Sequence, residues 1–375
     1  MHIMTLSLKR PARAGQVVFC SFALAAAPLC AAAERIPMTE AAWRINAEDH
    51  RFESYKGRES LYLKNGGAEA AGIDFENGVI ELDIAFANER GFSGVAFRRQ
   101  GPGEYEHFYL RPHQNGQPDA SQYTPEFHGL SAWQILYGPR YAAALDYRFD
   151  EWMHVKLVIS GEEADIYVDS DKPVLHIEKL MRDRRSGSLS LNSFFAPAHF
   201  ANVSVDRTAT AVIIGESAPL PAPAPGAIME WEISPAFDFK TLKETTQLSR
   251  EDLQAVEWRT LAVEENGVAN IARVAEFGEG RDAAFARLVI NSPRRQTRRL
   301  RFGFSDEVKA FVNGALVYSG ADGYMSRDHR FLGTVGLHDA IRLPLKKGRN
   351  EIIFAVKENF GGWAIAGALD EGDDQ

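Results

Sequence analysis

Between residues 105 and 113 the sequence places rings, a guanidinium group and imidazoles at every second position. One parity of the run YEHFYLRPH holds Tyr105, His107, Tyr109, Arg111 and His113, and the other holds Phe108 and Leu110. Because successive side chains of a β-strand point to opposite faces, a strand here would bury the apolar set and turn the polar set outward. Flat rings beside planar hydrogen-bonding groups suit a sugar, whose C–H faces pack on aromatic rings while its hydroxyls bond to polar side chains. The alternation therefore predicts a carbohydrate-binding face.

The segment that follows extends this set of candidate ligand-binding residues. The chain after this strand reads as a long polar loop, and Arg98 is expected to point the same way from the preceding strand. The loop carries Asn115, Asp119, Gln122, Tyr123, Glu126, His128 and Trp133. Loops longer than about 12 residues are usually functional or disordered, and the aromatic content argues against disorder. An alternative stays open, in which the aromatic residues form a small satellite core that pins the loop.

Two carboxylates and two histidines are candidate catalytic groups. Glu81 and Asp83 are expected on the same face as His107 and His113, and an acid and a base among these residues, or Glu106 as the acid, could act on a glycosidic bond. Retaining glucanases carry two glutamates in the pattern Glu-x-Asp-x-x-Glu. Here Phe86 stands where the second glutamate would be, so that mechanism would lose its proton donor. Whether the chain is an enzyme stays open.

Other chemistry has little support in the sequence. The motifs of serine hydrolases, zinc peptidases, phosphate-binding loops and dinucleotide-binding folds are absent. We expect no metal and no cofactor. Asp169 and Asp171 after a strand offer a weak alternative, a Ca²⁺ site, although an ordinary turn explains them as well.

The N-terminus and the charge balance bound the location and the partners. Lys9, Arg10 and Arg13 precede an apolar run that ends in three alanines, which predicts a signal peptide over residues 1–33 and an exported, bacterial protein, periplasmic or extracellular. Both cysteines, Cys20 and Cys30, lie in this peptide, so we expect no disulfide in the mature chain. No later segment is apolar enough to span a membrane. The net charge of -9 argues against nucleic acid as a partner. The oligomeric state is not predicted.

The remaining chain reads as two β-rich domains. Proline alternates with small residues over 218–226, which predicts an extended linker. Short alternating runs separated by turn residues precede and follow it, so we expect an all-β protein of two antiparallel β-sandwiches of jelly-roll type, over residues 34–206 and 228–375, with the linker over 207–227. The pair Asn313-Gly314 predicts a hairpin, and residues 249–257 a short helix.

The runs FENGVIELDIAF, GFSGVAFR, YEHFYLRPH, DEWMHVKLVISGEEADIYVD and HFANVSV resemble the concanavalin A-like sandwich of laminin G domains, lectins and glucanases. More narrowly, they resemble the bacterial 3-keto-disaccharide hydrolase domain family. Residues 93–98 match its Ser-Gly-[Val/Ile]-x-Phe-Arg strand, and Tyr105-Glu106 match its Tyr-Glu strand. The resemblance spans most of residues 36–206 and implies the fold more than an activity.

The second half resembles the galactose-binding-like jelly rolls that accompany glycosidases, over roughly residues 288–369. That resemblance implies glycan binding or domain packing, with Arg327, Asp328 and Trp363 as candidate contacts. We therefore expect a lectin-like protein that recognises a poly- or oligosaccharide. The alternatives are a hydrolase or lyase that acts on a modified disaccharide or a glucan, and a non-catalytic protein-interaction module.

Overall fold

Almost every element of the structure is a β-strand, which confirms the all-β antiparallel fold class. The computed structural model describes residues 33–208 and 211–370, so the expected signal peptide lies outside the described residues except for its last position. The strands up to residue 206 are β1 (Glu34–Arg35), β2 (Trp43–Tyr55), β3 (Arg58–Ala70), β4 (Gly78–Ala85), β5 (Gly91–Gly101), β6 (Glu104–Leu110), β7 (Ser121–Phe127), β8 (Leu130–Ser131), β9 (Ala142–Ala143), β10 (Met153–Ser160), β11 (Glu163–Val168), β12 (Leu175–Ile177), β13 (Ser188–Phe195) and β14 (Ala198–Asp206).

The later strands are β15 (Glu230–Ile233), β16 (Arg259–Ala262), β17 (Ala269–Asn270), β18 (Ala283–Ser292), β19 (Gln296–Phe304), β20 (Glu307–Val312), β21 (Ala315–Ala321), β22 (Asp339–Leu345), β23 (Gly348–Lys357) and β24 (Ala364–Leu369). The helices are the α-helix α1 (Arg250–Gln254) and the 3-10 helices η1 (Glu40–Ala42), η2 (Pro112–Gln114), η3 (Phe239–Leu242) and η4 (Ile271–Arg273). Helix α1 confirms the expected short helix and begins with a capping box between Ser249 and Asp252.

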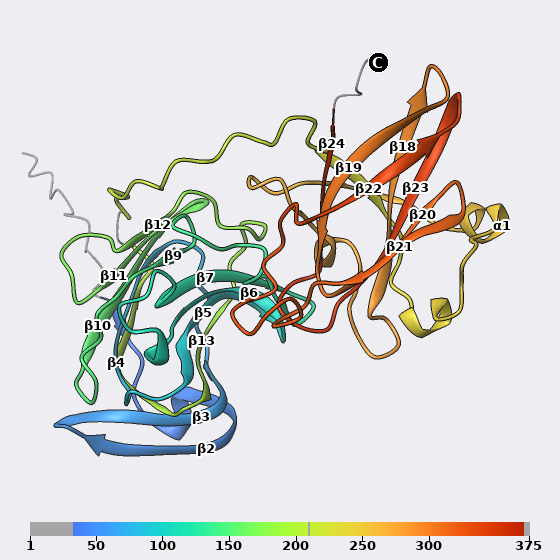
Figure 1. Ribbon diagram of the computed structural model, residues 1–375. Helices are drawn as coiled ribbons and strands as arrows, with labels where there is room; N and C mark the ends of the chain where they lie inside the picture. The colour runs from blue at the N-terminus through green and yellow to red at the C-terminus, as the bar shows by residue number, and fades with distance from the viewer. Residues whose placement is uncertain (1–32, 209–210, 371–375) are drawn as a thin grey trace, which may run out of the picture. The chain divides into compact units, whose positions relative to one another are not determined.

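The long strand β3 folds the first sheet into two layers. Its residues 60–63 pair with β14, and its residues 66–69 pair with β13. One layer therefore runs β12-β11-β10-β4-β14-β3, and the other runs β3-β13-β5-β6-β7-β8 (Figure 1). Apolar side chains of β4 and β10 in the first layer share one buried core with those of β5 and β6 in the second. Alternation along each strand thus buries one side and leaves the other outside the sandwich.

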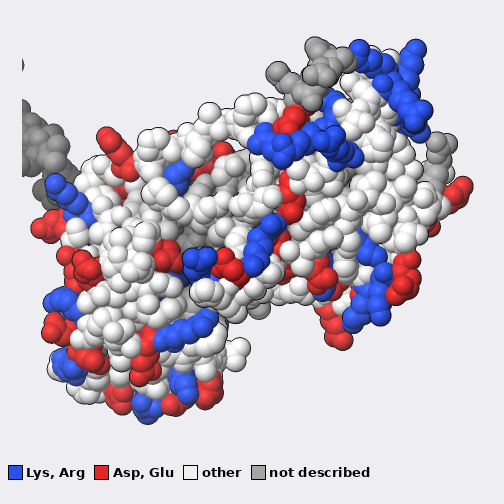
Figure 2. All heavy atoms as spheres, viewed as in Figure 1, with Lys and Arg blue, Asp and Glu red and all other residues white. Residues whose placement is uncertain are grey.

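The later strands form a second pair of sheets around their own core. The six-stranded sheet runs β16-β15-β18-β23-β20-β21, and the four-stranded sheet runs β17-β24-β19-β22. Phenylalanines of β19 and β23 and the indoles of Trp231 and Trp363 fill this core. Figure 2 shows basic and acidic side chains interspersed over the face in view, with wide uncharged stretches between them.

The proline-rich connection has neither helix nor strand over residues 211–224. It is nevertheless held by the first sandwich. The amides of Ile214 and Gly215 donate to the buried carboxylate of Asp165 (2.7 and 3.0 Å), and the carbonyl of Ala218 accepts from Arg140 (2.6 Å). Over this stretch the connection is therefore hydrogen-bonded to the first sandwich and is not a free spacer.

The hairpin between β20 and β21 has the predicted turn. Asn313 and Gly314 both have positive φ angles, 50° and 89°, as a type I′ turn requires. A Cβ at Gly314 would also lie 2.6 Å from the carbonyl oxygen of Leu248. We expect Gly314→Ala to lower the free energy of unfolding by about 1–2 kcal/mol in urea titrations. The control is Gly101→Ala, where the φ angle is ordinary and the space is open, and equal losses in both variants would contradict this account.

Candidate functional site

Strand β6 sends alternate side chains to opposite sides of the second layer, as its sequence predicts. Phe108 and Leu110 lie in the sandwich core. The register pairs His107 with Thr124 and Tyr109 with Gln122 of β7, so the outward row continues on the neighbouring strand. We call this row the polar face; its members are Tyr105, His107, Tyr109, Arg111, Gln122, Thr124 and Glu126.

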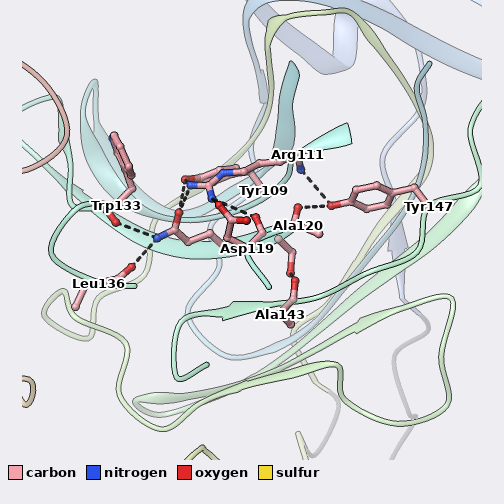
Figure 3. A network of polar contacts seen from close by, with 10 residues as sticks. Tyr109, Arg111, Asp119, Ala120, Trp133, Leu136, Ala143 and Tyr147 are labelled. Carbon is pink, nitrogen blue, oxygen red and sulfur yellow. Dashed lines mark hydrogen bonds and ion pairs between the residues drawn. The ribbon is translucent and has the colours of Figure 1, made fainter. Parts of the chain in front are cut away.

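Arg111 is the centre of a hydrogen-bond network on the polar face (Figure 3). Its Nη1 donates to the carboxylate of Asp119 at 2.8 Å and to the carbonyl of the same residue at 3.1 Å. Its Nη2 donates to the hydroxyl of Tyr109 at 2.9 Å and to the side-chain carbonyl of Gln122. The Tyr109 hydroxyl in turn donates to Gln122 at 2.8 Å. The planar groups of the face are therefore fixed relative to one another before any ligand arrives.

The same network binds the segment after β8, residues 133–136, to the polar face. The side-chain amide nitrogen of Gln122 donates to the carbonyls of Leu136 (2.6 Å) and Trp133 (3.1 Å). Tyr109, Arg111 and His107 are only 5%, 6% and 6% exposed. The sequence predicts these groups at an open surface; the structure buries all three, and Tyr109 and Arg111 are held by their own hydrogen-bond partners.

Nε2 of His107 and Nδ2 of Asn192 are buried nitrogens on this side of the sheet with no hydrogen-bond partner among the described residues, as are Nε of Arg111 and Nδ1 of His113. Asn192 of β13 pairs with Gly94 of β5, which pairs with Tyr109, so Asn192 lies on the same side as the polar face. Burial lowers the pKa of His107 to about 3, so its imidazole is neutral at any ordinary pH. Buried polar groups are normally satisfied, and these nitrogens therefore call for a ligand group or an ordered water.

Glu126 gives the polar face a group that changes charge near neutral pH. Burial raises the pKa of its carboxyl to about 7, against the opposing effect of a hydrogen bond from Tyr105. Glu126 and Tyr105 face each other across β7 and β6. This end of the face can thus donate or accept a proton at neutral pH, whereas His107 cannot.

One exposed and two half-buried aromatic rings border the face beside Arg111. The ring of Phe92 lies 5.2 Å from that of His113, 5.7 Å from that of Phe195 and 6.0 Å from that of Tyr109, centroid to centroid. Phe195 is 60% exposed, at the end of β13. We call Phe92, His113 and Phe195 the aromatic margin. The Arg111 guanidinium lies 5.9 Å from the Phe92 ring, so the margin adjoins the network directly.

Several sequence-predicted ligand contacts are corrected by the structure. Arg98 is buried at a bulge with a φ angle of 50°, and its guanidinium donates to the carbonyls of Glu76 (2.8 Å) and Gly161 (2.6 Å). Tyr123 faces the core, where its hydroxyl donates to Glu106 at 2.6 Å. Both residues therefore stabilise the sandwich. Tyr123 belongs to strand β7, whose alternation points it inward, and the bulge at Arg98 turns that side chain away from the direction that a regular strand would give it.

The carboxylates Glu81 and Asp83 lie in the other layer. Strand β4 pairs with β10 and β14, so these side chains point out of the first layer while the polar face points out of the second. Asp83 accepts from His154 (2.9 Å) and Asn202 (2.6 Å) and pairs with Arg58 (2.6 Å). The expectation that they join His107 and His113 is wrong, because the chain crosses between the layers before β5.

The remaining candidates are divided between surface and core. Asn115 is exposed, and its side-chain carbonyl accepts from the amide of Tyr147 at 2.6 Å. Trp133 is half-buried. In the second pair of sheets, Trp363 is fully buried and its indole donates to the carbonyl of Val356, so it is a core residue and not a contact. Arg327 forms ion pairs with Asp322 and Asp339, and Asp328 is exposed beside Arg330.

The grouping of metal-ligating side chains and the length of apolar helices can be read from the described part of the chain. No three His, Cys, Asp or Glu side chains there are grouped so that they could hold a metal ion. The weak Ca²⁺ candidate Asp169 instead binds the guanidinium of Arg148 (2.6 Å) and the amide of His154 (2.8 Å). No helix in residues 33–208 or 211–370 combines the length and the apolar character that a membrane crossing needs.

Sequence reasoning placed Gln122 and Glu126 in a loop of the site and missed Asn192 as a member, and Phe92 and Phe195 as its rim. The signal for a strand was present, because Gln122, Thr124 and Glu126 alternate with Tyr123 and Phe127 as a strand would have them. Asn192 and Phe195 gave no such signal, since only the pairing of β13 with β5 brings them to this face.

Comparisons with known proteins give distant structural likenesses. No family model matches the sequence, and no curated protein matches it. The chain is similar to a carbohydrate-binding module, CBM66, from Bacillus subtilis, with 16% identity and a TM-score of 0.35 over 44% of this chain and 95% of the other. It is similar to a β-glucanase of Bacillus licheniformis, with 10% identity and a TM-score of 0.34 over 46% and 97%. A galectin-like protein of unknown function from Bacillus subtilis gives 12% identity and 0.36 over 46% and 94%.

Proposed function

We propose that the chain binds an oligo- or polysaccharide on the outer side of the second layer. Sugar rings pack on Phe92 and Phe195 of the aromatic margin. The sugar hydroxyls bond to His113 and to the part of the Asp119 carboxylate that does not accept from Arg111. The observation that carries the proposal is that the half-buried ring of Phe92 and the exposed ring of Phe195 lie directly beside planar polar groups fixed by the Arg111 network. Apolar ring faces with a few well-oriented polar groups are what recognition of a sugar requires.

The unpartnered nitrogens of His107 and Asn192 support a polar ligand over an apolar one. They flank a strip of β5 where Gly94 and Ala96 carry little or no side chain. A hydroxyl-rich ligand, or a water that it orders, would supply the missing partners. A purely apolar ligand would leave both nitrogens unsatisfied at a cost of roughly 1–3 kcal/mol each.

The alternative activity, a hydrolase or lyase, has less support. Its candidate acids and bases are separated: Glu81 and Asp83 lie in the first layer, Glu106 in the core, and His107 is buried and neutral. Glu126, with its pKa of about 7, and His113 of the aromatic margin remain as groups on this side that are suited to move a proton. Binding without turnover is therefore the proposal, and the interaction-module alternative has no observation in its favour.

Export and the division into two domains belong to the same proposal. The signal peptide over residues 1–33 and the domain limits 34–206 and 228–375 rest on the sequence pattern. A periplasmic or extracellular location would place the aromatic margin in contact with cell-wall or environmental glycans.

Removing rings of the aromatic margin is expected to weaken glycan binding by about tenfold per ring, the loss of about 1.4 kcal/mol of stacking. Wild type, Phe92→Ala, Phe195→Ala and His113→Ala are compared by affinity electrophoresis in β-glucan, α-glucan, galactan and fructan gels, and then by calorimetry on the retaining glycan. Met229→Ala, an exposed apolar position of the other sandwich, is the control. A wild-type protein that no gel retards, or margin variants that bind like the control, would overturn the proposal.

A further inference from the structure

Three aromatic rings from separate loops converge at a second place, next to the polar face. The Trp133 indole lies 5.7 Å from the ring of Phe360 and 6.4 Å from that of Tyr324, and the latter two are 6.3 Å apart. Tyr324 is 38% exposed and Phe360 58%. Rings that only filled a contact between sandwiches would be buried, whereas Tyr324 and Phe360 leave much of their area open and Trp133 is half-buried. We call Trp133, Tyr324 and Phe360 the aromatic platform.

The loop that presents Phe360 is held by two buried carboxyl groups, an energetically unfavourable arrangement. The buried carboxylate of Asp306 accepts from the amides of Asn359 (2.5 Å) and Phe360 (2.9 Å), and that of Glu358 accepts from the amide of Gly362 (3.0 Å). Gly361 and Gly362 have positive φ angles, 109° and 131°. Burying two neighbouring carboxyl groups is unfavourable, so a loop that does so to hold an exposed ring is a candidate for function.

The platform is continuous with the polar face. Gln122 of the Arg111 network donates to the carbonyl of Trp133, whose ring belongs to the platform. The next residue, Gln134, is fully buried; its backbone amide donates to the carbonyl of Gly361 (2.9 Å) and its side-chain amide to that of Leu332 (2.7 Å). Its side-chain oxygen has no partner among the described residues. The position of the Trp133 ring is thus coupled to the network on one side and to the Phe360 loop on the other.

We infer that the aromatic platform is a second subsite for the same saccharide, so that the ligand is a chain of several sugar units and not a mono- or disaccharide. This inference rests on the proposed function. Strands β5 and β7 are two strand spacings apart, about 10 Å, and the Trp133 carbonyl accepts from Gln122 of β7, so a ligand that reaches from Phe92 to the Trp133 ring needs several sugar units.

The experiment measures affinity against chain length, with an oligosaccharide series of two to eight units made from whichever polysaccharide the wild type binds in gels. We expect affinity to rise steeply up to about four to six units and then level. Phe360→Ala and Tyr324→Ala should reduce affinity for the long members by about tenfold, one stacked ring each, and leave the disaccharide unchanged. Phe195→Ala should weaken every member of the series.

The outcomes separate the two proposals. If the wild type binds no member, the proposed function fails. If it binds with an affinity that does not depend on length, or if Phe360→Ala binds the long members like the control Val317→Ala, the platform inference is overturned while the proposed function stands. Phe360, Tyr324 and Val317 are exposed, so the variants are expected to fold, and thermal melting verifies this.

Discussion

Replacing Arg111 with alanine is expected to lower the free energy of unfolding of the first sandwich by about 3 kcal/mol, the lower end for removing one partner of a hydrogen-bonded charge pair, because the guanidinium is buried while the Asp119 side chain is 33% exposed. The guanidinium bonds to the Asp119 carboxylate, to Tyr109 and to Gln122. Without it, the buried side-chain carbonyl of Gln122 loses one of two donors and the Asp119 carboxylate loses its cation. These losses add to the cavity left by the side chain itself.

The loss should appear as a drop in melting temperature of about 6–12 °C, given 2–4 °C per kcal/mol for a domain of this size. Arg44→Ala is the matched control, because Arg44 is exposed and lies 3.9 Å from Glu69, so its removal should cost less than about 0.5 kcal/mol. If Arg111→Ala had the same melting temperature as the control, the network would not stabilise the fold. Loss of glycan binding in this variant would not by itself identify a contact, since the surface above the network would loosen too.

The direction of each side chain on β6 could be predicted because it depends only on alternation within one strand. Phe108 and Leu110 are buried and Tyr109 points away from the core, as the period of two requires. The turn at Asn313 and Gly314 was equally local, since two positive φ angles select those residue types. Strand β7 was missed because Pro125 and several polar residues resemble a loop, although Tyr123 and Phe127 kept the alternation.

The composition of the site depends on pairings between distant segments, which the sequence does not state. Asp83 meets His154, 71 residues later, and not His107, because β4 pairs with β10 in the other layer. Arg98 was expected outside, but a register shift after Phe97 turns it to the carbonyls of other loops. Burial of the polar face depends likewise on the segment that Gln122 binds. Local alternation fixes which way a residue points, and only the packing decides what covers it.

The second large effect concerns pH. Burial, with the neighbouring Asp306 carboxyl adding to it, raises the pKa of Glu358 to about 8, whereas an unfolded chain has the ordinary glutamate value of about 4.5. Between these values the folded protein keeps a proton on Glu358 that the unfolded chain has released. The stabilisation from this proton is complete below about pH 4.5 and is lost as the pH rises to about 8. Burial raises the pKa of Glu106 and Glu126 as well, so these carboxyls contribute in the same direction.

We therefore expect the wild type to be more stable at pH 5 than at pH 8.5, and Glu358→Gln to have a flatter profile because its amide carries no charge at either pH. The amide oxygen can still accept from Gly362, so the Phe360 loop keeps that contact. Urea titrations from pH 4.5 to 9 measure both profiles. Glu279→Gln is the control, and its profile should run parallel to that of the wild type. Parallel profiles for Glu358→Gln and the wild type would mean that Glu358 is already ionised in the folded protein, and Asp306 and Glu358 would then have to hold the Phe360 loop as two adjacent negative charges.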